Sequence, residues 1–135
     1  RVLQGGPTEV RGVALSADGR RFAWGSGDDS LRAGDLDDPA PPQRLPLRAS
    51  ARCVALSADG RLLAGGDSAG ALYLWDGPGL APRATDAAHD DAVGALAFGV
   101  DGAVLFSGGW DYTLRATGLR RDGPLPRSPR RRPSR

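Results

Sequence analysis

One short stretch occurs three times in this sequence. It reads VRGVALSADGR over residues 10–20, RCVALSADGR over residues 52–61 and VGALAFGVDG over residues 93–102. The aspartates of the three copies, Asp18, Asp59 and Asp101, are separated by 41 (59 − 18) and 42 (101 − 59) residues. A regular period of this length indicates that the chain builds one small supersecondary unit several times, and that each unit buries its apolar surface against its neighbours.

Each period contains short segments with the composition of β-strands. In the second period they are residues 53–56, which alternate and run into a Ser-Ala-Asp-Gly turn, residues 61–65, residues 71–75 (ALYLW) and the looser segment 82–85. The corresponding segments are 10–15, 21–25, 30–34 and 43–47 in the first period, and 92–98, 103–107 and 113–117 in the third. Four short strands in a period of about 40–45 residues are typical of a β-propeller blade.

The sequence therefore predicts an all-β fold, a partial β-propeller of three four-stranded antiparallel blades. The blades fall at about residues 8–47, 50–88 and 90–118 of a domain spanning residues 1–118, in which residues 1–4 fit the outer strand of a preceding blade. The outer strand of the third blade is the weakest, because residues 119–121 are short and precede Gly123-Pro124. Closed propellers have about 4–8 blades. We therefore interpret the chain as a fragment, completed by further blades on missing sequence or on another chain.

The second and third copies resemble the WD-repeat family. The second ends Leu72-Tyr73-Leu74-Trp75-Asp76, which is similar to the Trp-Asp dipeptide that closes such a repeat. The third contains His89, the apolar segment 93–98 and the run Ser107-Gly108-Gly109-Trp110-Asp111-Tyr112-Thr113. The resemblance covers about residues 1–118 and implies a propeller whose work is to bind partners.

The resemblance also implies a hydrogen-bonded network of His, Asp, Ser or Thr, and Trp within each blade. The third repeat has His89, Ser107 and Asp111, but Thr117 stands where the tryptophan is expected. The second repeat keeps Trp75 of this set and the first keeps Asp28. Because no repeat has the full set, we expect packing rather than buried hydrogen bonding to supply most of the stability.

The charge of the chain is unevenly distributed. The formal net charge is +2, yet residues 118–135 hold seven arginines and one aspartate, while residues 1–117 hold eleven arginines and fifteen acidic residues. Residues 119–135 form a basic, proline- and arginine-rich tail that we expect to be disordered. Its arginines could contact the phosphates of a nucleic acid: Arg127, Arg130, Arg131, Arg132 and Arg135.

Nothing in the sequence indicates catalysis, a cofactor or a bound metal. His89 and Ser107 are assigned to the structural network, no glycine-rich phosphate loop is present, and a metal reading of His89 beside Asp90 and Asp91 is the weaker alternative. The single cysteine, Cys53, cannot form an internal disulfide and is interpreted as a small buried apolar residue. These features favour an intracellular protein, cytoplasmic or nuclear, without a membrane span.

The remaining hypothesis concerns one end of the propeller, where the resemblance places partner-binding residues. Trp110 occupies a turn at that end, and a large exposed aromatic residue is a plausible binding hot spot. The same correspondence adds Asp90, Ala92, Arg48, Ser50, Pro7 and Glu9. We therefore predict a non-catalytic interaction scaffold that binds a protein or peptide. The alternatives are nucleic-acid association through the tail, or a regulatory or sensor portion of a larger multidomain enzyme.

Overall fold

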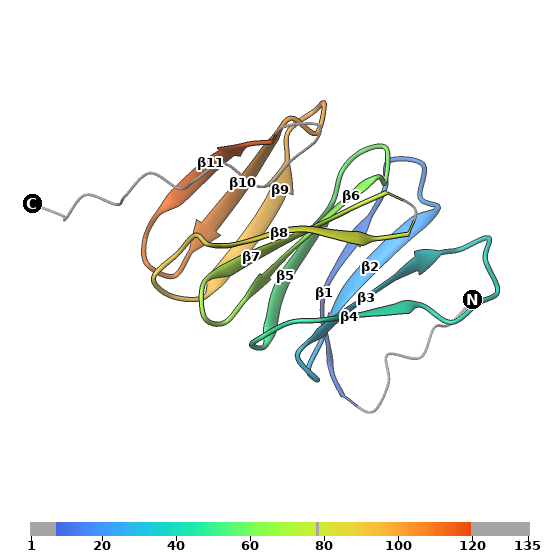
Figure 1. The fold of residues 1–135 in the computed structure, drawn as a ribbon, viewed down its shortest axis with the longest axis horizontal. Coiled ribbons are helices and arrows are strands. Elements are labelled where there is room, and N and C mark those ends of the chain that lie inside the picture. The colour runs from blue at the N-terminus through green and yellow to red at the C-terminus, as the bar shows by residue number, and fades with distance from the viewer. Residues whose placement is uncertain (1–7, 78, 120–135) are drawn as a thin grey trace, which may run out of the picture.

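The computed structural model describes residues 8–77 and 79–119, and within them the chain is entirely β (Figure 1). Eleven strands of this described part form three antiparallel sheets. The first sheet contains β1 (Val10–Leu15), β2 (Arg21–Ser26), β3 (Ser30–Asp35) and β4 (Gln43–Pro46). The second contains β5 (Ala51–Leu56), β6 (Leu62–Asp67), β7 (Ala71–Asp76) and β8 (Ala81–Ala87), and the third contains β9 (Val93–Phe98), β10 (Val104–Gly109) and β11 (Leu114–Gly118). The all-β prediction is confirmed.

Each sheet is a simple meander, and the three sheets stand side by side like blades (Figure 1). Within each sheet the strands pair in chain order, and β5, the first strand of the second sheet, contacts both β1 and β9. Stacking of this kind, with the first strands together, is the arrangement of a propeller.

Three strands of the third sheet are described, and most of the segment predicted for its outer strand, residues 119–121, lies outside the described residues. Leu119 is the last described residue, and its backbone NH donates to the carbonyl of Ala103 at 2.7 Å. This bond extends the pairing of β11 with β10 beyond the end of both strands. The predicted strand at residues 1–4 and the predicted disorder of residues 120–135 lie outside the described residues.

The Asp-Gly turns that identified the repeat close the hairpin between the first two strands of each sheet. Gly19, Gly60 and Gly102 have φ values of 72°, 73° and 72°, a left-handed conformation that glycine adopts without strain. In each turn the aspartate side chain accepts a hydrogen bond from a backbone NH two residues later, at 2.9 to 3.0 Å. The conserved spacing of the three copies therefore reflects three equivalent turns.

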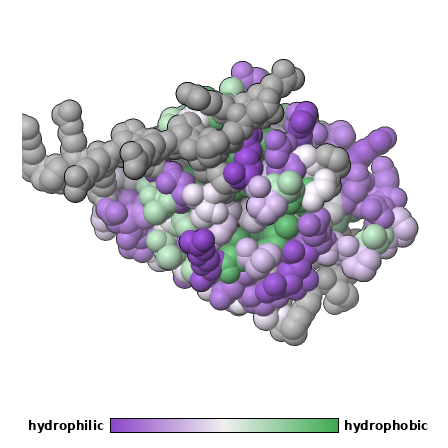
Figure 2. Space-filling view, in the orientation of Figure 1, coloured by the Kyte–Doolittle hydropathy of each residue, from purple (hydrophilic) through white to green (hydrophobic). Residues whose placement is uncertain are grey.

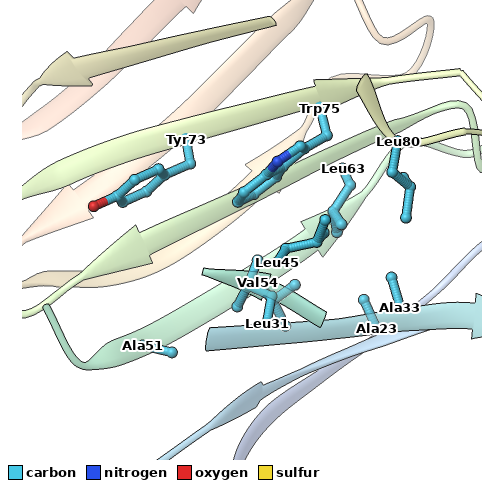
Figure 3. Packing of buried hydrophobic residues seen from close by; sticks show 10 residues of the cluster. All are labelled: Ala23, Leu31, Ala33, Leu45, Ala51, Val54, Leu63, Tyr73, Trp75 and Leu80. Atoms are coloured by element: carbon cyan, nitrogen blue, oxygen red, sulfur yellow. The ribbon is translucent and has the colours of Figure 1, made fainter. Parts of the chain in front are cut away.

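The first core lies between the first and second sheets (Figure 3). The first sheet contributes Ala23, Leu31, Ala33 and Leu45, and the second covers them with Ala51, Val54, Leu63, Tyr73, Trp75 and Leu80. Tyr73 and Trp75 stack with their ring centroids 5.8 Å apart and their planes 9° apart. Burial of these side chains between sheets is the main source of stability that the described residues show.

The second core repeats this arrangement between the second and third sheets. Ala64, Leu72 and Leu74 of the second sheet pack with Val93 and Leu105 of the third. In the repeat alignment these three residues of the second sheet correspond to Ala23, Leu31 and Ala33 of the first. We call the side of a sheet that carries these positions its forward face, and the opposite side its backward face. Hydrophilic residues cover much of the outer surface shown in Figure 2, with hydrophobic surface between them.

Close packing between the sheets depends on glycine at Gly66. A Cβ atom built there would lie 2.6 Å from the Cβ of Val93 and 2.8 Å from the sulfur of Cys53, both too close for real contacts. We predict that Gly66→Ala destabilises the protein by about 2 kcal/mol through overpacking, measured by urea unfolding. Gly118→Ala is the control, because nothing lies within 4 Å of a Cβ at that position. Equal stability of the two variants would contradict this account of the packing.

Candidate functional site

One hydrogen bond, repeated in all three sheets, builds the end of the molecule at which β1, β5 and β9 begin. We call this the upper end. The backbone NH groups of Gly27, Ser68 and Trp110 donate to the carbonyls of Glu9, Ser50 and Ala92 at 3.0, 2.9 and 2.8 Å. Each bond ties the turn between the second and third strands of a sheet to the segment that leads into its first strand. Three turns and three lead-in segments are thereby fixed at one end.

Trp110 has the largest side chain at these three equivalent turn positions, where the other two sheets have glycine and serine. Its ring lies beside Gly94, where a Cβ would be only 3.0 Å from the indole nitrogen. The guanidinium carbon of Arg52, on the second sheet, lies 5.3 Å from the centre of the ring, within the range of a cation–π contact. Trp110 therefore bridges two sheets, yet it remains 58% exposed.

The other residues predicted for this surface differ in their access to solvent. Asp90, Glu9 and Arg48 are exposed, whereas Ser50 is half-buried. The hydroxyl of Ser50 donates to the carboxylate of Asp29 on the first sheet at 3.2 Å. Ala92 is only 3% exposed, so its side chain is part of the packing and its carbonyl holds Trp110. Pro7 lies outside the described residues.

His89 is the centre of a buried polar network in the third repeat. Its Nε2 lies 2.9 Å from the hydroxyl of Ser107, and its Nδ1 lies 3.1 Å from Asp111 Oδ1 and 3.0 Å from the hydroxyl of Thr113. Asp111 also accepts from the backbone NH of Asp90 at 3.0 Å and from the Thr113 hydroxyl at 2.6 Å. The network joins the segment leading into β9 to the turn between β10 and β11.

The order Ser107–His89–Asp111 matches that of a hydrolytic triad, but its placement does not suit catalysis. A nucleophilic serine must meet its substrate, and Ser107 is 0% exposed. The three side chains are instead saturated by one another. Their arrangement stabilises the loop that carries Asp90 and the turn that carries Trp110.

The ionisation of Asp111 fits this structural role. Burial alone would raise its pKa, but hydrogen bonds from the Thr113 hydroxyl, the Asp90 backbone NH and His89 outweigh that effect and hold the pKa well below its ordinary value. The carboxylate is therefore ionised at neutral pH and accepts these bonds, since an ionised carboxylate has no proton to donate.

The first and second sheets use different polar groups at the same end. Asp28 accepts from Arg32 at 2.9 Å and from the Ser30 hydroxyl, and these bonds together lower its pKa to about 2, with the Ser30 bond the largest cause. In the second sheet, the Tyr73 hydroxyl donates to buried Asp67 at 2.7 Å and accepts from the Arg48 backbone NH at 2.9 Å. Trp75, predicted as a network member, stacks on Tyr73 in the core.

The Asp67–Tyr73 pair and the Arg52–Trp110 contact were missed by sequence reasoning. Asp67 lies two positions before Ala69, which stands at the position of Asp28 and Asp111 in the second repeat, and Tyr73 shows no signal except its alternation within β7. Arg52 and Trp110 come from different repeats, so no local pattern could have paired them.

Two further features, the Cys53 thiol and a hollow, bear on the prediction that the chain is not catalytic. Burial raises the pKa of the Cys53 thiol to about 12, which keeps it protonated and unreactive. At the opposite end of the molecule, a hollow of about 370 Å³ lies between the second and third sheets. Its two arginines, Arg61 and Arg83, lie 3.3 and 3.9 Å from Asp76, and the carboxylates of Asp59 and Asp101 also line it.

Within residues 8–77 and 79–119, no three His, Cys, Asp or Glu side chains are grouped so that they could hold a metal ion. No helix in that part of the chain is long and apolar enough to cross a membrane. The tail arginines proposed to contact nucleic acid, Arg127, Arg130, Arg131, Arg132 and Arg135, lie outside it.

The sequence also matches a known family. The family model described as "WD domain, G-beta repeat" matches residues 47–76 and 81–116. The chain belongs to the WD-repeat family. WD-repeat domains generally mediate protein–protein interactions, and WD-repeat scaffolds are generally not enzymes. No curated protein matches this sequence.

Solved structures show the same WD-repeat fold. The chain resembles the structure titled "Crystal structure of RRP9 WD40 repeats" with a TM-score of 0.80 and 23% identity, and the one titled "Structure of U3-55K" with a TM-score of 0.81 and 23% identity. Each match covers 88% of this chain and 38% of the other. The chain therefore spans well under half the length of these WD-repeat structures.

The Asp111 network should make the stability of this WD-repeat chain depend on pH. A carboxyl whose pKa is lowered by folding stabilises the protein above its ordinary value of about 4, and this contribution is lost as the pH falls through the folded-state pKa. We predict that Asp111→Asn lowers the free energy of unfolding by about 2 kcal/mol at pH 7 and flattens its decline below about pH 4. Urea unfolding at several pH values, followed by circular dichroism, measures both effects. Parallel pH profiles for wild type and variant would show that Asp111 does not contribute in this way.

Proposed function

We propose that this chain binds a protein or peptide at its upper end, with Trp110 as the central anchor. The observation that carries the proposal is that Trp110 is held in place by a backbone bond to Ala92 and by the Arg52 contact, while 58% of its surface is exposed. An aromatic side chain that is already ordered loses little entropy on binding. Such residues are the ones most often found as binding hot spots.

Arg52 gives the site a chemical preference. Its guanidinium lies over Trp110, and in the described residues no carboxylate lies within ion-pair distance of it. By contrast Arg11, at the equivalent position of the first sheet, is paired with Glu9. A peptide that places an apolar side chain on the indole and a carboxylate on Arg52 satisfies both groups at once. We therefore propose that the site recognises a partner segment in which an apolar residue stands next to an acidic one.

The three sheets are not equivalent in this function. The positions that correspond to Trp110 are Gly27 and Ser68, which offer no comparable contact surface. Asp90 and Glu9 are exposed on the same end and restrict which charges a partner can bring near the anchor. Binding should thus concentrate where the second and third sheets meet.

The test is selection of binding peptides from a displayed library of random short peptides, followed by measurement of their affinities. We predict that Trp110→Ala weakens the affinity for the selected peptides by about 30-fold, equivalent to about 2 kcal/mol. Arg52→Ala should weaken acidic peptides more than neutral ones. Val100→Ala is the matched control, because Val100 is an exposed apolar residue of the same sheet in the turn at the opposite end. Unchanged affinity in Trp110→Ala would remove the anchor from the proposal.

A further inference from the structure

Exposed charges of opposite sign flank Trp110 at the upper end. Arg48 and Arg52 are both exposed, and within residues 8–77 and 79–119 neither lies at ion-pair distance from a carboxylate. Asp91, on the segment that leads into β9, is also exposed and makes no ion pair in the same part of the chain. The second sheet thus offers positive charge, and the segment that leads into the third offers negative charge.

Contacts fix both kinds of charge beside the same aromatic side chain. The guanidinium carbon of Arg52 lies 5.3 Å from the centre of the Trp110 ring. The backbone NH of Trp110 donates to the carbonyl of Ala92, the residue after Asp91, at 2.8 Å. The carboxylate of Asp91 accepts the backbone NH of Ala92 at 2.7 Å, which orients it. Arg52 is therefore held at the ring of Trp110, and Asp91 is held near its backbone.

One small turn joins the basic segment to the acidic one. In the turn between β6 and β7, the backbone NH of Ser68 donates to the carbonyl of Ser50 at 2.9 Å, and the carbonyl of Gly70 accepts the backbone NH of His89 at 3.1 Å. A Cβ at Gly70 would lie only 2.7 Å from the carbonyl oxygen of Asp91, so the acidic segment packs directly on this turn. The turn reads Ser-Ala-Gly, and none of its side chains is long enough to separate the two segments.

This charged surface is distinct from the faces through which the sheets pack. Neighbouring sheets meet through the forward face of one and the backward face of the next. The second sheet is packed on both faces, yet Arg48 and Arg52 remain exposed, so the packing of sheets on one another does not cover them. Asp91 lies on the segment that passes between the second and third sheets, both of which are described.

We infer that the partner segment carries charges of opposite sign on the two sides of its apolar residue, an inference that rests on the proposed function. Its acidic side chain pairs with Arg52, and Arg48 adds to the favourable potential. Its basic side chain pairs with Asp91. The occupant is thus a peptide segment of another protein with an acidic, an apolar and a basic side chain. A segment with two acidic side chains would bring one of them to Asp91, and such like-charge contacts are unfavourable.

The experiment uses the peptides that the full chain selects from the displayed library. Each selected peptide is compared with a version whose basic residue is replaced by glutamine and a version whose acidic residue is replaced by glutamine. For wild type, each replacement should weaken affinity about 5-fold, as expected for exposed ion pairs. Both effects should shrink as salt is raised, because exposed charges are screened.

Variants of the chain assign each effect to its residue through double-mutant cycles. In Asp91→Asn, loss of the peptide's basic residue should no longer matter, while loss of its acidic residue should still weaken binding about 5-fold. Asparagine retains the oxygen that accepts the Ala92 NH, so the loop should keep its form, which circular dichroism checks. Arg48→Gln should reduce the effect of the peptide's acidic residue only.

Asp38→Asn is the matched control. Asp38 is an exposed aspartate at the opposite end of the molecule, and its carboxylate also accepts a backbone NH, that of Ala40, at 2.9 Å. This variant should bind all peptide versions as wild type does. Selected peptides without a basic residue, or a basic residue whose effect persists in Asp91→Asn, would overturn the two-sided recognition, even if Trp110→Ala still weakens binding. If Trp110→Ala leaves affinity unchanged, the proposed anchor and this inference both fall.

Discussion

The structure depends on the burial of apolar side chains between neighbouring sheets. Each described sheet is only three or four strands wide, and a sheet of that size cannot shield its own apolar faces from water. Leu31 and Leu72 show how the problem is solved, because each is completely covered by the sheet that follows it along the chain. The turns and the upper end take the geometry that keeps neighbouring sheets packed face to face.

Polar groups contribute in a different way in each sheet. The third has the His89–Asp111 network, the second has the Asp67–Tyr73 pair, and the first has Asp28 with its serine and arginine partners. All three occupy the upper end, where the chain passes from one sheet to the next and where backbone NH groups need acceptors. The chemistry of these networks varies because the requirement is only that buried groups be satisfied.

The same variation makes the upper end asymmetric and therefore specific. A backbone bond fixes the turn in every sheet, but only the third sheet places a tryptophan on it. Where the first sheet pairs its arginine with Glu9, the second leaves Arg52 against an aromatic ring. The three repeats share one backbone frame. Single residue differences at equivalent positions make one part of the surface chemically different from another.

The sequence by itself determined the repeat, the strands and the turns, because these follow from local rules: alternation within strands and glycine in the left-handed conformation at Gly19, Gly60 and Gly102. The resemblance to WD repeats also implied that His89, Ser107 and Asp111 form one network. Tertiary structure alone decided that Ala92 is buried, that Tyr73 bonds Asp67, and that Arg52 lies over Trp110. Those outcomes depend on which side chains from different sheets meet across an interface. The residue pattern along one strand does not predict which residues of a neighbouring sheet it will contact.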